Sequence, residues 1–230
     1  MKFRLLCFGS HLFISFLIAL LSLLVVFLLW YPSPLDVALG VANIFLLLLC
    51  IDVIVGPLLT LLVAKQGKKT LKTDLLTIGI LQLAALSYGL YIVAQGRPVW
   101  IVYDNNRFEV VQAFEAVIYP DSSSQLSLNI TGVEWRAVKD SVPISIGRRD
   151  AFYRQEYLQP YALVTINAGK QAIPLEVLKR FNDHEKIDEL FRHYPEADGY
   201  IPMVAKEKAL VVLVNRAIGK PIAIIDASPW

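Results

Sequence analysis

Long blocks of apolar residues with very few charges fill the sequence from Phe8 to Val63 and again from Leu75 to Val93. A membrane-spanning helix needs about 20 consecutive apolar residues, because it crosses roughly 30 Å of hydrocarbon at about 1.5 Å per residue. The sequence therefore predicts an integral membrane protein with three transmembrane helices. We expect a transmembrane region over residues 1–95, with spans at about 8–30, 37–64 and 74–94, followed by a separate domain over 96–230.

The basic residues between and before these spans predict the orientation in the membrane. Lys2 and Arg4 precede span 1, and four lysines lie in the connection 65–72, whereas the turn "YPSPLD" after span 1 has none. Basic residues favour the cytoplasmic side, so three crossings carry residues 96–230 to the other side. The first apolar run is longer than a signal-peptide core and no small-residue cleavage site follows it, so we interpret it as a retained signal anchor.

Composition and motifs argue against several classes of function. A formal net charge of +2 gives no basic surface suited to nucleic acid. Cys7 and Cys50 both lie in or beside spans, and His11, His184 and His193 do not share a metal-ligand spacing. The sequence has no glycine-rich phosphate loop, G-x-S-x-G turn or H-E-x-x-H motif. We therefore expect no enzyme, no cofactor, no metal site and no nucleic-acid partner.

Mixed secondary-structure signals follow the third span. Runs rich in β-branched and aromatic residues predict strands, and the pattern of 174–195 predicts a helix that can break near Asn182-Asp183. The polar stretch "YPDSSSQLS" at 119–127 predicts a flexible loop. We expect an α+β extracytoplasmic domain with a mainly antiparallel sheet. The predicted strands are 98–104, 107–119, 161–167, 209–215 and 220–226.

Asp52 stands within the apolar sequence of span 2. A charged side chain at the centre of a bilayer costs about 2.5–3.5 kcal/mol on insertion scales, so such residues are generally paired or functional. One interpretation is a structural hydrogen bond to Gln82 on span 3, or to Ser15 or Ser22 on span 1. The other is that Asp52 faces a groove and recognises another membrane helix.

Gly56 and Pro57 follow one turn later in the same span. Proline removes an amide donor and crowds the carbonyl four residues earlier, which predicts a kink, and Gly56 provides a notch for close helix approach. The Thr60 hydroxyl can hydrogen-bond backward and satisfy the opened turn. An ordinary membrane-helix kink explains these residues. Together with Asp52 they also meet the requirements of a docking site for a partner helix.

The stretch "GRPVWIVYDNNRF" at 96–108 comes directly after span 3. Arg97 and Trp100 suit the membrane interface, where a guanidinium meets lipid phosphate and an indole lies at headgroup depth. Asn105-Asn106 predicts a turn, across which Asp104 pairs with Arg107. We expect this stretch to position the outer domain above the membrane.

Together, "DVIVGPLLTLLV" at 52–63, "GRPVWIVYDNNRFEVV" at 96–111 and three spans resemble the type IV pilin accessory proteins of the TfpX/TfpZ group. The resemblance covers essentially the whole chain, although 133–209 contributes little to it. The residues that carry it are Asp52, Gly56, Pro57, Thr60, Arg97, Trp100, Asp104, Arg107 and Phe108.

This resemblance implies a chaperone-like accessory protein of the bacterial inner membrane, with a cytoplasmic N-terminus and a periplasmic domain. Its implied partners are a cognate major type IV pilin, other inner-membrane components of pilus assembly and the lipid bilayer. It would promote pilin stability, pilus assembly or pilus dynamics without catalysis. Our hypothesis is that Asp52, Gly56, Pro57 and Thr60 receive the membrane helix of pilin. The alternatives are a membrane-anchored extracytoplasmic sensor or regulator, and a pilin-modifying membrane enzyme.

Overall fold

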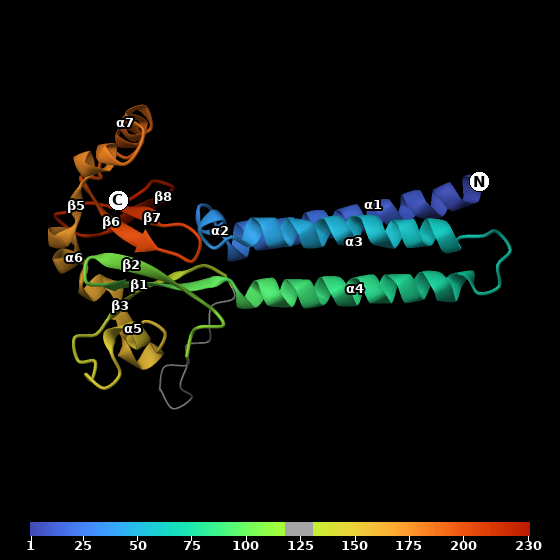
Figure 1. Ribbon diagram of the computed structural model, residues 1–230, viewed down its shortest axis with the longest axis horizontal. Helices are drawn as coiled ribbons and strands as arrows, with labels where there is room; N and C mark the ends of the chain where they lie inside the picture. Colours follow the sequence, from blue (N-terminus) through green and yellow to red (C-terminus); the bar gives the residue numbers. More distant parts are fainter. Residues whose placement is uncertain (118–130) are drawn as a thin grey trace. The chain divides into compact units, whose positions relative to one another are not determined.

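The chain divides into two compact units in a computed structural model that describes residues 1–117 and 131–230 (Figure 1). The first, which we name the helical unit, comprises 1–30 and 41–96. The second, the sheet unit, comprises 31–40 and 97–230. The segment between the first two long helices therefore belongs to the same unit as the domain that follows the third.

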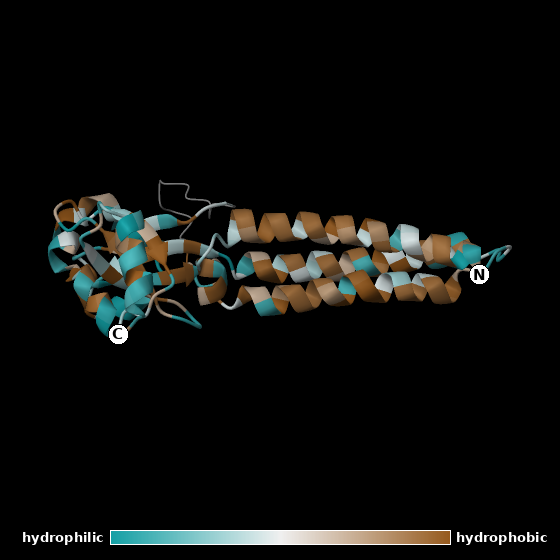
Figure 2. Ribbon diagram, turned by 90° about the horizontal axis from the view of Figure 1, so that it is seen from above, coloured by the Kyte–Doolittle hydropathy of each residue, from teal (hydrophilic) through white to brown (hydrophobic). Residues whose placement is uncertain are grey.

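The helical unit consists of three long helices that are each apolar enough to cross a membrane. Hydrophobic residues dominate all three helices along their length (Figure 2). Many of their leucine, isoleucine and phenylalanine side chains are exposed, as expected for surfaces that face lipid. The predicted three spans are confirmed. The helices are α1 (Lys2–Leu24), which continues as the π-helical segment η1 (Val25–Trp30), α3 (Val41–Val63) and α4 (Leu71–Gln95).

The start of the second span differs from the sequence prediction, while the predicted kink at Pro57 stays a prediction. The short helix α2 (Leu35–Ala38) precedes this span, and Gly40 then adopts a left-handed backbone conformation with a φ of 69°. That conformation ends α2, because it does not fit an α-helix, so the long helix begins at Val41. Pro57 lies inside α3, and the helix continues through it without a break to Val63.

Among its described residues the sheet unit has an eight-stranded sheet with the order β4-β3-β1-β2-β6-β7-β8, and β5 also pairs with β6. Two neighbouring pairs, β1–β3 and β2–β6, are parallel, and the other pairs are antiparallel. The predicted α+β class with a mainly antiparallel sheet is confirmed. The strands are β1 (Pro98–Asp104), β2 (Arg107–Gln112), β3 (Glu134–Val138), β4 (Leu158–Pro160), β5 (Ile173–Pro174), β6 (Gly199–Val204), β7 (Leu210–Val214) and β8 (Pro221–Ile225).

Helical segments connect these strands. The predicted helix over 174–195 is two helices, and the predicted break is confirmed because Asp183 caps the second one by accepting a hydrogen bond from the Glu185 amide at 3.0 Å. The helical segments are α5 (Arg148–Ala151), η2 (Gln155–Tyr157), η3 (Tyr161–Leu163), α6 (Thr165–Gln171), η4 (Leu175–Arg180) and α7 (His184–His193).

The prediction of a strand over 161–167 is wrong, because this stretch forms η3 and the start of α6. Tyr161 serves tertiary packing instead, because its side chain is buried and its hydroxyl donates to the Gly219 carbonyl at 2.8 Å. The predicted strand 107–119 ends at Gln112, where a turn begins. The predicted polar loop 119–127 lies outside the described residues.

Two apolar clusters cover the sheet. One packs β1, β2 and β3 against α5 and includes Trp100 and Phe152. The other packs β7 and β8 against α7 and η4 and includes Ile187 and Tyr200. In each cluster a helix, α5 or α7, packs on the sheet and buries apolar side chains of the strands.

The segment 31–40 is held firmly in the sheet unit. Tyr31, Leu35 and Ala38 are buried, and the Ala38 carbonyl accepts a hydrogen bond from the Glu207 amide at 2.9 Å. Since this segment joins α1 to α3 and the rest of the unit follows α4, both lie on the same side of a membrane that the three helices cross.

Candidate functional site: a polar network and groove in the helical unit

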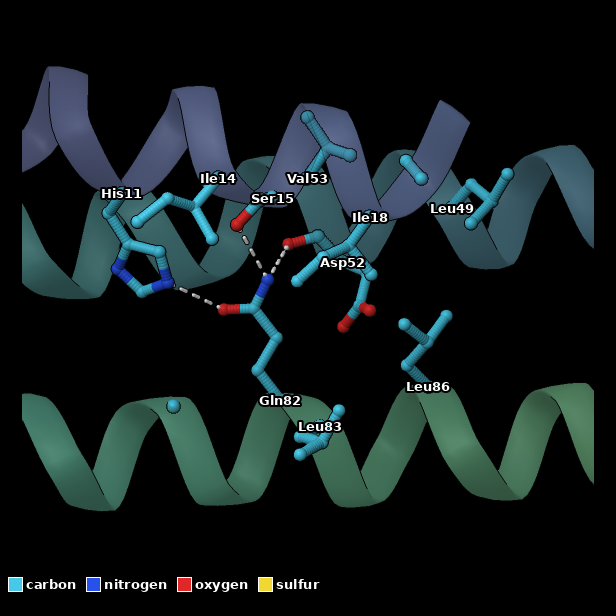
Figure 3. A pocket seen from close by; sticks show the side chains of 12 residues that line it. His11, Ile14, Ser15, Ile18, Leu49, Asp52, Val53, Gln82, Leu83 and Leu86 are labelled. Carbon is cyan, nitrogen blue, oxygen red and sulfur yellow. Dashed lines mark hydrogen bonds between the residues drawn. The ribbon is translucent and has the colours of Figure 1, made fainter. Parts of the chain in front are cut away.

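A chain of hydrogen bonds links all three long helices within the apolar helical unit. His11 on α1 lies 2.6 Å from the Thr60 hydroxyl on α3 through Nδ1, and 3.0 Å from Gln82 Oε1 on α4 through Nε2. Gln82 Nε2 donates to the Ser15 hydroxyl at 3.0 Å and to the Asp52 backbone carbonyl at 2.9 Å. Figure 3 shows the Gln82 side chain reaching from α4 to both other helices.

The direction of each hydrogen bond follows from Gln82. Its amide nitrogen uses both hydrogens on Ser15 and the Asp52 carbonyl, so its oxygen is the acceptor toward His11. His11 Nε2 therefore carries a hydrogen, and in the neutral ring Nδ1 accepts from the Thr60 hydroxyl. The network thus satisfies its buried polar atoms from within the bundle, which is how polar residues hold membrane helices together.

The Asp52 carboxylate is not part of this network. The predicted bond between Asp52 and Gln82 exists only through the Asp52 main chain, and Ser22 donates to the Ile18 carbonyl at 2.9 Å instead. In residues 1–117 and 131–230 the carboxylate has no hydrogen-bond or ion-pair partner. It points into the space beside Leu86 (Figure 3). The structural-bond interpretation of its side chain is therefore wrong.

The other three residues of the predicted docking face lie inside the bundle. Gly56, Pro57 and Thr60 are buried, whereas Asp52 is half-buried. A Cβ at Gly56 would overlap the side-chain amide of Gln82, so the glycine makes room for the network. The Thr60 hydroxyl bonds His11 and not the main chain of its own helix, contrary to our expectation. Of the four residues, only Asp52 presents surface to a partner.

A groove lies beside the network. Helix α3 packs along both α1 and α4, while α1 and α4 make few direct contacts with each other. The resulting cavity of about 190 Å³ has walls from all three helices. Its lining is largely apolar, and its residues are His11, Ile14, Ser15, Ile18, Ala19, Leu49, Asp52, Val53, Gly79, Gln82, Leu83 and Leu86.

His11 is the residue that sequence reasoning missed. It was considered only as a metal ligand, and the described residues hold no group of three or more His, Cys, Asp or Glu side chains that could bind a metal. A usable signal existed, because His11 and Ser15 are four residues apart and therefore share one face of a helix. Two polar residues on one face of an otherwise apolar span indicate a helix contact.

In the sheet unit, the predicted turn after β1 is confirmed, since Asn105 and Asn106 have φ values of 43° and 69°. Asp104 and Arg107 stand opposite each other across this turn, as predicted, but their side chains do not form an ion pair. The buried Asp104 carboxylate accepts hydrogen bonds from Arg148 on α5, while Arg107 lies 3.6 Å from Glu109. Hydrogen bonding to Asp104 raises the pKa of the Arg148 guanidinium above its ordinary value.

Trp100 does not occupy the interfacial position expected of it, whereas the interfacial role of Arg97 stays a prediction. Trp100 is 3% exposed and lies in an apolar core cluster, so its indole is not available to lipid headgroups. Phe108 is fully buried and packs edge-on against Tyr103 and Trp135. Arg97 is half-buried at the start of the sheet unit. Strand β1 and Phe108 thus belong to the core of the sheet unit.

Known proteins with similar sequences decide the family. Residues 1–40 match the model of the fimbrial assembly protein FimB. The fimbrial assembly protein of serogroups C1 and C2 of Dichelobacter nodosus is 32% identical over 105 residues, which cover 45% of this chain and 80% of that protein. The chain belongs to the FimB fimbrial assembly protein family. The resemblance to a pilus accessory family is thereby confirmed.

Other FimB family members from the same organism differ in length. The fimbrial assembly proteins of serogroups I and E1 are 34% and 33% identical over 105 residues, which cover 45% of this chain. The match spans 41% of the length of each of these relatives. No solved structure matches this FimB family member.

The ion pair of Arg148 with Asp104 gives a stability prediction for this FimB family member. We expect Arg148→Met to destabilise the sheet unit by about 1 kcal/mol, because it leaves a buried carboxylate without its charged donor. Arg107→Met should cost less than about 0.5 kcal/mol, because Arg107 is half exposed and forms only a surface ion pair. Thermal unfolding of the detergent-solubilised chain followed by near-UV circular dichroism measures both. If Arg107→Met destabilises the sheet unit more than Arg148→Met does, the assignment of Arg148 as the main partner of Asp104 is contradicted.

Proposed function

We propose that this protein acts in fimbrial assembly as an accessory protein of the bacterial inner membrane that assists its cognate major type IV pilin. The observation that carries the proposal is the groove between α1 and α4 with the unpartnered Asp52 carboxylate in it. A groove of this kind suits a membrane helix. Membership of the FimB family, whose curated members bear the name fimbrial assembly protein, supports the process.

The two units suggest two separate binding surfaces for pilin. A pilin before assembly has an apolar membrane helix and a globular head, so a helper needs one surface for each. In our proposal the groove binds the helix, and the sheet unit contacts the head in the periplasm. The lysines in the connection 65–72 favour the cytoplasm for that end of the bundle. The sheet unit and the segment 31–40 are then both periplasmic.

We further propose that the protein works by binding and not by catalysis. Its effect on pilin would be to shield the membrane helix and to hold the head until the subunit is added to the fibre. Other inner-membrane assembly components and the bilayer itself complete the proposed set of partners.

Coexpression with the cognate pilin tests this function. We expect Asp52→Ala to reduce the pilin that copurifies in detergent by roughly 3- to 20-fold, the range of polar contacts between membrane helices. Surface pili should fall with it. Ile51→Ala is the matched control, because Ile51 is the neighbouring residue, is 55% exposed and does not line the groove. Unchanged copurification and unchanged surface pili with Asp52→Ala would contradict the proposal.

A further inference from the structure

We propose that the exposed ring of Phe114 inserts into the headgroup layer of the membrane and fixes the sheet unit on the bilayer surface. The partner is phospholipid, so this inference goes beyond the proposed function and does not depend on pilin. Phe114 lies in the turn that follows β2 and is 62% exposed. Exposure alone says little, because single apolar side chains are common on protein surfaces. The inference rests on where the chain places this ring.

The main chain beside Phe114 is bonded to the point at which the chain leaves the third long helix. The Ala113 amide donates to the Arg97 carbonyl at 2.9 Å. Arg97 comes two residues after Gln95, the last residue of α4. The turn that carries Phe114 is therefore tied by a hydrogen bond to the chain just outside the third span.

Phe114 also adjoins the segment that joins the first two long helices. Phe114, Lys206 and Leu39 line one cavity of about 260 Å³ within the sheet unit. Leu39 belongs to the segment 31–40, and Gly40 alone separates it from the start of α3. Two connections to membrane helices, one after α4 and one before α3, thus meet beside Phe114. Each is two residues long and spans at most about 7 Å, so the chain itself keeps Phe114 near the membrane surface.

Aromatic residues of the long helices indicate the depth of the headgroup layer. Tyr88 and Tyr91 on α4 are 68% and 57% exposed, and Trp30 ends η1. Tyrosine and tryptophan are enriched at the level of the headgroups, and Tyr91 is four residues, or about 6 Å, before Gln95. The headgroup layer is roughly 5–8 Å thick on each side, so α4 ends within it or at its outer boundary. The ring of Phe114 is within reach of that layer.

The charges beside Phe114 favour insertion into phospholipid of any charge and not selection of anionic lipid. Lys206 and Glu207 are exposed neighbours of opposite sign, and Lys208 forms an ion pair with Asp226. The described residues around the ring therefore make no basic patch. The gain comes from removing apolar surface from water, and phenylalanine side chains suit the boundary between headgroups and acyl chains. A pilin head is the competing occupant, and the experiment separates the two.

Depth-dependent quenching in the full chain tests the inference. Cys7 and Cys50 are replaced by alanine, and Phe114→Cys then carries an NBD fluorophore in phosphatidylcholine vesicles without pilin. Spin-labelled headgroups quench a fluorophore that reaches their layer, so we expect strong quenching and blue-shifted emission at 114. Ile218→Cys is the control, because Ile218 is 54% exposed but follows β7, whereas Lys206 precedes that strand. A fluorophore at 218 should be quenched several-fold less and emit as in water.

A reporter beside Phe114 tests the phenyl ring itself. A fluorophore on Lys206→Cys should be quenched in the chain that keeps Phe114 and lose this quenching several-fold with Phe114→Ser. Near-UV circular dichroism checks that the variant stays folded, as expected for a change at an exposed side chain.

Three outcomes would overturn the inference. They are water-like emission at 114, quenching at 206 that Phe114→Ser leaves unchanged, and protection of the fluorophore at 114 only when pilin is added, which would assign this surface to pilin. Pilin copurification tests the proposed function separately, because the first two measurements contain no pilin.

Discussion

Alanine at Gly219 should destabilise the sheet unit by about 2–5 kcal/mol. Gly219 has a φ of 67°, and a Cβ built there would overlap the main-chain carbonyl of Thr165. The left-handed conformation costs a non-glycine residue roughly 1–2 kcal/mol, and overpacking against atoms that cannot move adds about 1–3 kcal/mol. The contact is main chain against main chain, so no side-chain rotation relieves it.

Gly219 matters because it lets α6 approach the turn between β7 and β8. Gly169 on α6 faces the same turn, where a Cβ would overlap the Arg216 carbonyl. The Tyr161 hydroxyl adds a hydrogen bond to the Gly219 carbonyl. Forcing the two main chains apart would therefore disturb this bond as well.

Gly132→Ala is the matched control for Gly219→Ala. Gly132 has a similar positive φ of 80°, but open space surrounds the position where its Cβ would stand. It should cost only about 1–2 kcal/mol, the conformational part alone. Thermal unfolding of the full chain in detergent compares the two variants. Equal destabilisation would mean that the close approach of α6 contributes nothing, contrary to the packing described here.

The membrane part of the fold could be predicted from sequence because its cause is simple. Hydrocarbon accepts only long apolar helices, so the length of each apolar block sets each span. The start of the second span was misplaced because Val37 and Ala38 are apolar like the span itself. Only the backbone of Gly40 separates them from it.

The sheet unit was harder, because its pairing depends on contacts between distant residues. Strand β6 contains Pro202 and is buried along nearly its whole length, so it shows neither alternation nor a run free of proline. The stretch 161–167 has strand-like composition, yet tertiary packing against the turn before β8 makes it helical. Local preference was overridden in both places.

The sequence predicts the candidate site from its most costly residue, Asp52, but misassigns the side chains around it. Asp52 stands out in the sequence because an acidic side chain in hydrocarbon is costly and is therefore generally paired or functional. Which side chain meets which depends on helix rotation, and one span's sequence does not fix that. The partner of Asp104 was misassigned for the same reason. Arg107 is near it in sequence, but the fold places Arg148 of α5 beside its carboxylate.

Replacing Gly56 with alanine should destabilise the helical unit by about 2 kcal/mol. The new Cβ would occupy the place of the Gln82 amide and displace it from its three partners, each contact being worth about 0.6 kcal/mol in a membrane protein. Gly79→Ala is the control, because its Cβ would stand in open space and alanine favours the helix. Thermal unfolding in detergent measures both variants.

A double-mutant cycle with Gln82→Ala shows whether the glycine acts through the network. If Gly56 is small only to admit Gln82, then Gly56→Ala should cost almost nothing once Gln82 is shortened, because the overlapping atoms are gone. The coupling energy would then nearly equal the cost of Gly56→Ala alone. An undiminished cost in the Gln82→Ala background would mean that Gly56 is needed for another contact.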